Sequence, residues 1–248
     1  MSSFEPKRRS RDTRIKSRPT MRSTMKRRLQ WGFASLLTVI SMLAYAGEPA
    51  SEEVKKPGQW DVNAVYLWPG PTAIADAPDR PRIATVKSPS EKLALLINEN
   101  DLIVSGRDGA RVAGPIKIDD LVEVSWSPGS LHFAVTASDG GWVGSWTATV
   151  YTLAQTGMNR FDASPLIAAR FQSRKGGCDE VPNVAAAGWL GPDVLLVVAQ
   201  APPHSSCNDM GTFRGYELSI RDRRIQREYD ASELLSKFSN RLGPRLKG

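Results

Sequence analysis

Histidine and cysteine, on which most metal sites and many catalytic sites depend, are scarce in this chain. Its 248 residues include two of each. His132 falls in an apolar run and His204 in a proline-rich loop, and neither has another His, Cys or carboxylate near it at a metal-ligand spacing. The sequence therefore predicts no metal site and no cofactor. We interpret His132 as a hydrogen-bonded residue of a sheet.

Motifs for nucleophilic catalysis and for phosphate binding are also missing. The chain contains no Gly-x-Ser-x-Gly and no Gly-x-x-x-x-Gly-Lys. The glycines of 140–144 lie between two expected strands, where they indicate a hairpin rather than a nucleotide-binding loop. The spacing of Cys178 and Cys207 is unlike Cys-x-x-Cys, which excludes the usual redox motif. Nothing in these patterns favours an enzyme.

Positive charge is concentrated near the start of the sequence. The whole chain carries a formal net charge of +7. Residues 1–46 hold eleven Lys/Arg and two Asp/Glu, and the remainder holds twenty-two and twenty-four, a net charge of −2. A nearly neutral domain lacks the basic surface that holds a phosphate backbone. We therefore expect no nucleic-acid partner.

An export signal explains this distribution of charge. Lys26–Arg28 is positive, Trp31–Leu43 is apolar and uncharged, and Ala44-Tyr45-Ala46 is typical of a cleavage site. This order predicts a signal peptide over 25–46, cleaved after Ala46, and a periplasmic or secreted protein. The alternative is an uncleaved N-terminal membrane anchor, because the apolar segment is about as long as the shortest spanning helix. That segment would be the protein's contact with the membrane.

The remaining segments differ in composition. Residues 1–24 are rich in Arg, Lys and Ser, which predicts a disordered basic extension or a start-site artefact. Residues 47–58 predict a flexible lead-in, residues 59–242 a single β domain, and residues 243–248 a tail. In an oxidising compartment, Cys178 and Cys207 favour one disulfide bond; two buried thiols are the alternative.

Short runs of aliphatic, β-branched and aromatic residues alternate with turn residues through this domain. Helical periodicity is nearly absent before residue 230, so the pattern predicts an all-β fold. The clearest expected strands are Val62–Trp68, Leu93–Ile97, Leu102–Ser105, Leu121–Trp126, Leu131–Thr136, Trp146–Leu153, Val194–Ala199 and Tyr216–Arg221.

Three segments share a proline turn, an apolar strand, and then a more alternating strand. The turns are Ser88-Pro89-Ser90, Ser127-Pro128-Gly129 and Gly191-Pro192-Asp193. An apolar run of this length is typical of a central strand buried on both faces. The prolines are 39 and 64 residues apart. The first spacing fits one propeller blade, and the second fits if about 20 residues are inserted.

Residues 126–135, Trp-Ser-Pro-Gly-Ser-Leu-His-Phe-Ala-Val, resemble the Ser-Pro-Asp-Gly strands of WD-like and Tol-type periplasmic β-propeller repeats. The other copies depart from that pattern at Ser90-Glu91-Lys92 and at Gly191. The resemblance implies antiparallel four-stranded blade-like units in a small or incomplete β-propeller, with Trp60–Asp76 as a partial fourth unit. An antiparallel β-sandwich is the alternative fold.

A helical pattern follows the last strand. Asp230 opens a capping-box-like sequence, and Gly243-Pro244 ends the helical pattern. Leu234, Leu235, Phe238 and Leu242 share one helical face. We expect a short C-terminal helix that closes the core.

The candidate binding residues fall in loops. Trp142, between glycines at the expected hairpin tip, presents a flat apolar face to a ligand unless it folds back onto the sheet. The long cysteine-bearing loops are the other candidates. We predict an exported, non-catalytic binding or scaffold module that contacts a protein or other envelope ligand through loops. A hydrolase-type enzyme on the same scaffold is the alternative. The candidate ligand-binding residues are Asp139, Trp142, Trp146 and His204.

Overall fold

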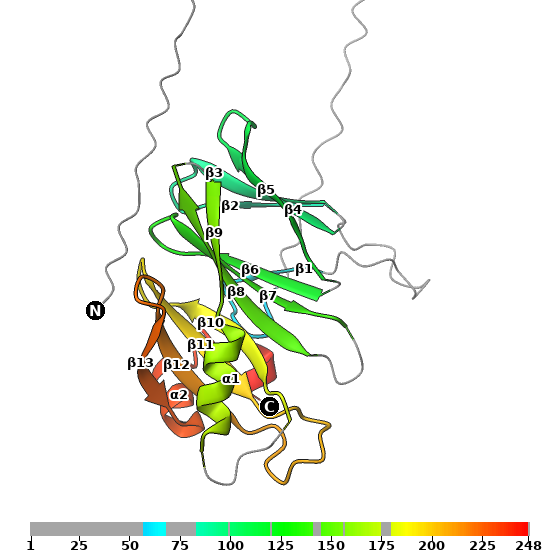
Figure 1. Cartoon of the computed structure of the whole chain (residues 1–248), viewed down its shortest axis with the longest axis vertical. Helices are drawn as coiled ribbons and strands as arrows, with labels where there is room; N and C mark the ends of the chain where they lie inside the picture. Colours follow the sequence, from blue (N-terminus) through cyan, green and yellow to red (C-terminus); the bar gives the residue numbers. More distant parts are fainter. Residues whose placement is uncertain are drawn as a thin grey trace, which may run out of the picture. The chain divides into compact units, whose positions relative to one another are not determined.

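Three antiparallel sheets follow one another along the chain (Figure 1). The computed structural model describes residues 57–67, 83–98, 100–119, 121–140, 145–155, 157–174 and 180–247. The first sheet contains β2 (Ile83–Lys87), β3 (Leu93–Asn98), β4 (Asp101–Gly106) and β5 (Arg111–Lys117) in that order. The expected signal peptide, the basic extension and Ala46 lie outside the described residues, so they stay predictions.

The second and third sheets have the same up-and-down order, and one strand is added to the second. The second sheet runs β1 (Val65–Leu67), β6 (Leu121–Trp126), β7 (His132–Ser138), β8 (Trp146–Ala154) and β9 (Gly157–Asp162). The third runs β10 (Asn183–Trp189), β11 (Val194–Gln200), β12 (Phe213–Ser219) and β13 (Arg224–Tyr229). The short helices are α1 (Ser164–Gln172), α2 (Ala231–Phe238) and the 3-10 turn η1 (Pro244–Leu246).

The expected fold class is confirmed at this level. The described chain is mostly β, its sheets are antiparallel units of four or five strands, and α2 follows the last strand. Three sheets replace the two of the alternative β-sandwich. Of the expected partial fourth unit, the described part forms only the strand β1, which pairs with β6.

The three proline turns occupy equivalent places. They precede β3, β7 and β11. Each of these is the second of the four consecutive strands in its sheet, when the added strand β1 is left aside. In the first two copies the serine carbonyl accepts a hydrogen bond from the amide three residues later, at 2.9 Å in both, from Glu91 and from Ser130. Both of those residues have positive φ, 56° and 59°. The repeat read from sequence therefore corresponds to a repeated turn geometry.

The second sheet packs against a sheet on each face. On β7, Phe133 and Val135 belong to a core shared with the first sheet, whereas Ala134 belongs to a core shared with the third. In β3 only Leu95 and Ile97 are buried. Among the described residues, another sheet covers only one face of the first sheet. Burial on both faces, expected for all three apolar strands, is thus a property of β7 and β11.

An indole hydrogen bond recurs at the two junctions between sheets. Trp126 Nε1 donates to the carbonyl of Val86 in the first sheet at 3.0 Å. Trp189 Nε1 donates to the carbonyl of Ser125 in the second sheet at 3.3 Å. Each acceptor lies three residues before the proline of its own unit. Because both donors and acceptors are buried, each bond joins neighbouring sheets where water does not compete.

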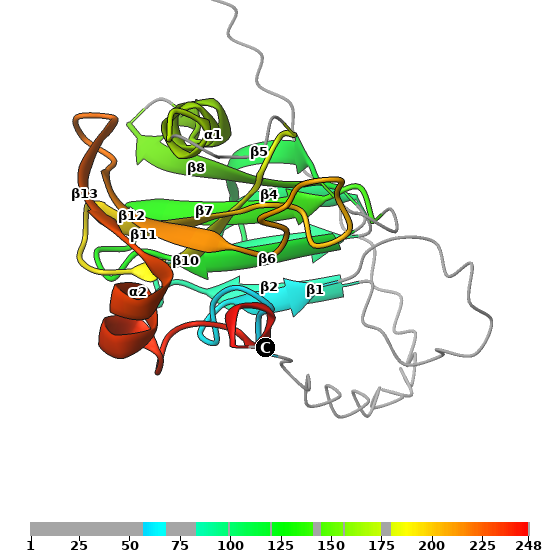
Figure 2. The same ribbon diagram turned by 90° about the horizontal axis from the view of Figure 1, so that it is seen from below.

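The helices lie on opposite faces of the third sheet (Figure 2). Ile167 and Phe171 of α1 share a core with β10 and β11, while Leu234 of α2 packs on the other face. The expected capping box of α2 is confirmed, with Glu233 N donating to Asp230 Oδ1 at 2.8 Å. The helix α1 was not expected; with its flanking loops it fills the stretch between β9 and β10 that lengthens the second proline spacing.

The first and last described segments pair with each other. Gly243 N donates to Trp60 O at 2.8 Å, and Val62 N donates to Arg241 O at 2.9 Å. A Cβ added at Gly243 would come within 2.2 Å of Gln59 O, so this approach requires glycine. Leu246, in the segment expected as a tail, is buried in the same core as Trp60.

We expect Trp189→Phe to lower the free energy of unfolding by about 1–2 kcal/mol, because it removes the indole hydrogen bond and contact area. Trp126→Phe loses a comparable amount through the equivalent bond. Urea denaturation measures both. Leu131→Ala, at an exposed side chain, is the control and changes stability by less than about 0.5 kcal/mol. Wild-type stability of both Trp variants would contradict this account of the junctions.

Candidate functional site

A line of hydrogen-bonded side chains crosses the junction between the second and third sheets. His132 Nδ1 lies 2.8 Å from Thr152 Oγ1, and His132 Nε2 lies 3.0 Å from Asp193 Oδ1. The other Asp193 oxygen accepts from Arg221 at 2.7 Å. The His132 ring also stacks on Trp189, with centroids 6.0 Å apart. Both ring nitrogens are thus hydrogen-bonded, as expected for a sheet histidine.

The repeated turns bring these residues together. Thr152 faces His132 across the β7–β8 pair, and Asp193 belongs to the third proline turn. Hydrogen bonds from His132 and Arg221 hold the pKa of the Asp193 carboxyl below its ordinary value. The third turn has Gly191 where the other copies have serine, and it carries a carboxylate, Asp193, where they have Ser90 and Gly129.

This line forms one wall of a cleft of about 310 Å³. The cleft lies where β7 and β11 begin, between residues 159–161 of β9 and the β12–β13 turn. Its lining residues include three arginines and a single acidic residue, so positively charged residues predominate. The residues that line it are Leu131, His132, Thr152, Asn159, Arg160, Phe161, Asp193, Ile220, Arg221 and Arg223.

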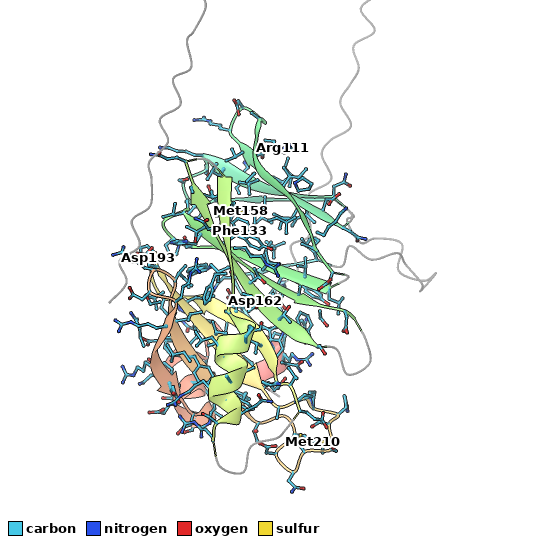
Figure 3. The ribbon with its side chains drawn as sticks, in the orientation of Figure 1. Arg111, Phe133, Met158, Asp162, Asp193 and Met210 are labelled. Atoms are coloured by element: carbon cyan, nitrogen blue, oxygen red, sulfur yellow. The ribbon has the colours of Figure 1, made fainter. Side chains whose placement is uncertain are left out.

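The loops singled out from the sequence leave the sheets at the other end of these strands. Trp146 N, where β8 begins, donates to Asn183 Oδ1 at 3.1 Å where β10 begins. Glu180 Oε1 accepts from Ser206 N at 3.0 Å and from Ser206 Oγ at 2.8 Å. We call residues 139–140, 180–182 and 201–212 the loop surface. Figure 3 shows Asp193 and Met210 at opposite ends of the third sheet.

The expected ligand-binding residues have different environments. Asp139 and His204 are exposed on the loop surface. Trp146 is only 4% exposed, and its ring meets Trp60 edge to face at 5.8 Å. An indole buried in the core offers no face to a ligand. Trp142 lies outside the described residues, although the hairpin expected around it is confirmed by the pairing of β7 with β8.

The cysteine loops are tied together at least through Glu180 and Ser206. Cys207 is not a free cysteine. Cys178 lies outside the described residues, so its pairing with Cys207 stays a prediction. Sequence reasoning missed Thr152, Asp193, Arg221 and Arg223 as neighbours of His132. One signal was present, because the Asp of the propeller-like pattern recurs as Asp193 in the third copy.

A second buried cluster lies where the first and last segments meet the second sheet. Glu123 accepts hydrogen bonds from Gln59 N at 2.6 Å and Trp60 N at 3.2 Å. Burial outweighs these bonds and raises the pKa of Glu123 to about 7. The Arg245 guanidinium lies 4.9 Å from the Trp60 ring centre and 5.6 Å from that of Trp146. The cluster closes the core and lines no part of the cleft.

Other kinds of site find no support within the described ranges. No group of three or more His, Cys, Asp or Glu is arranged there to hold a metal ion. None of the helices described there is long and apolar enough to cross a bilayer. Comparison of the chain with protein-family models, curated proteins and solved structures found no match.

The buried Glu123 makes stability depend on pH. Its pKa is raised from 4.5 to about 7 in the folded protein, so its contribution is fully present below pH 4.5 and is lost as pH rises through 7. Between pH 5 and pH 8 we expect wild type to lose on the order of 2 kcal/mol relative to Glu123→Gln. Urea denaturation of both proteins at each pH measures the difference. A pH-independent difference would contradict this assignment.

Proposed function

We propose that this protein is an exported, non-catalytic binding or scaffold module whose sheets are the blades of a small, incomplete β-propeller. The equivalent proline turns and the two indole hydrogen bonds between successive sheets support the repeat. Stacked units of this kind hold loops of different lengths on a rigid frame. The partner is a protein of the envelope that contacts the loop surface.

One observation carries this proposal: large apolar side chains are exposed on loops that hydrogen bonds hold in place. Val181 is 75% exposed and Met210 is 53% exposed, on the two segments that Glu180 and Ser206 join. Methionine adapts its shape to different partners, and apolar groups surrounded by polar ones are typical of protein interaction surfaces. Asp139 and His204 supply polar groups on the same surface.

We expect Met210→Asp to weaken partner binding by about tenfold or more, because a carboxylate would be buried at an apolar contact. The partner is first captured from an envelope extract and purified. Calorimetry then compares its affinity for wild type and variant. Val112→Asp is the matched control, because Val112 is 45% exposed on β5, away from the loop surface. Unchanged affinity for Met210→Asp, or equal losses in both variants, would contradict the proposal.

The alternative, a hydrolase, has one observation in its favour. Thr152, His132 and Asp193 follow the order of nucleophile, base and orienting acid beside a cleft. However, Thr152 lies within the β8 ladder, between β7 and β9, where pairing engages main-chain N–H groups that an oxyanion site would need. A binding role is therefore the stronger proposal.

We expect wild type and Thr152→Val to release p-nitrophenol from p-nitrophenyl acetate at the same background rate, because Thr152 is held as a structural hydrogen-bond partner of His132. Absorbance at a fixed pH measures the release. Circular dichroism verifies that the variant is folded. Turnover by wild type that disappears in Thr152→Val would establish the hydrolase instead.

A further inference from the structure

The cleft beside His132 has an excess of positive charge that the loop surface does not explain. Arg160, Arg221 and Arg223 line it together with one carboxylate, Asp193. Both oxygens of Asp193 are already engaged, one by His132 and the other by Arg221. The single negative charge is therefore compensated within the wall, and Arg160 and Arg223 have no ion pair among the described residues.

The charged residues of the β12–β13 turn differ in whether they line the cleft. Between the two arginines stands Asp222, which accepts a hydrogen bond from Ser219 Oγ at 3.0 Å and lies 3.5 Å from Arg224 Nε. Asp222 does not line the cleft, whereas Arg221 and Arg223 do. In the described part of the chain Arg223 forms no ion pair; its guanidinium lies 5.3 Å from the centre of the Phe161 ring. It is thus placed in the cleft and available to an anion.

Apolar surface adjoins these charges. Leu131, Phe161 and Ile220 line the same cleft, and Leu131 is 47% exposed. A volume of about 310 Å³ is at the lower end of the range for small-molecule sites. An apolar wall with a few convergent polar groups is typical of such sites, because the wall contributes affinity and the polar groups orient the ligand.

We propose that this cleft binds a small organic anion, with its acid group between Arg221 and Arg223 and its apolar body against Phe161 and Leu131. Guanidinium groups bind carboxylates and phosphates through paired, charge-assisted hydrogen bonds, so both acid groups fit. Asn159 supplies an additional amide in the cleft. The site is independent of the loop surface, which lies at the other end of the strands.

The two histidines provide a direct test. His132 forms part of the cleft wall and His204 lies on the distant loop surface. Their ring-proton NMR signals therefore report separately on the cleft and on the loop surface. Benzoate and phenyl phosphate are added to the protein at constant pH and ionic strength, with benzyl alcohol as the neutral probe. We expect at least one anion to shift the His132 signals saturably, and benzyl alcohol and His204 to show no comparable change. The better anion distinguishes a carboxylate ligand from a phosphate ligand.

Variants of two adjacent arginines distinguish a specific site from a general effect of positive charge. Arg223→Gln is expected to weaken anion binding by about tenfold, because it removes the guanidinium that has no other ion pair. Arg224→Gln removes the same charge from the next residue, where β13 begins, which does not line the cleft; the affinity of this variant for the anion stays within about twofold of wild type. The proposal is overturned if neither anion shifts His132, or if the two variants weaken binding equally.

Discussion

Burial of both faces of the second sheet is the constraint on which the other elements depend. Its inner strands contribute alternate side chains to two cores, Phe133 to one and Ala134 to the other. Polar atoms between the layers must then find partners inside the protein. Thr136 Oγ1 accepts from Ala186 N at 2.9 Å, and the Trp126 and Trp189 indoles bond to carbonyls of the preceding sheet. Stacking of the sheets therefore buries these polar atoms, and the hydrogen bonds between the sheets satisfy them.

One polar contact in the cleft wall comes from a variation in the repeat. In the first two copies, a serine hydroxyl of the turn accepts from the amide five residues later, at 3.2 Å in each. The third copy has Gly191 at that place and Asp193 two residues on. Its carboxylate reaches across the junction to His132 instead of closing its own turn. The third turn thus contributes to the wall of the cleft an acidic side chain for which the other two turns have no counterpart.

The sequence predicts the elements with the strongest local signals. Leu121–Trp126 matches β6, and the capping box at Asp230 begins α2, because apolar runs and cap residues act locally. Other strands, such as β5 and β13, were missed, since they are edge strands with few buried residues. The helix α1 buries only Ile167 and Phe171, too few for a periodic signal. The cleft depends on residues 61 positions apart, His132 and Asp193, which local patterns do not bring together.

The pairing of the first and last described segments has a consequence for the order of folding. Trp60 is fully buried against Leu242 and Leu246, which follow it by about 180 residues in the chain. Apart from β1, which pairs with β6, the three sheets are built from strands that are neighbours in the chain, whereas this closure requires distant residues. Until residues 241–246 have been synthesised, an otherwise folded chain exposes an indole and the outer face of β10.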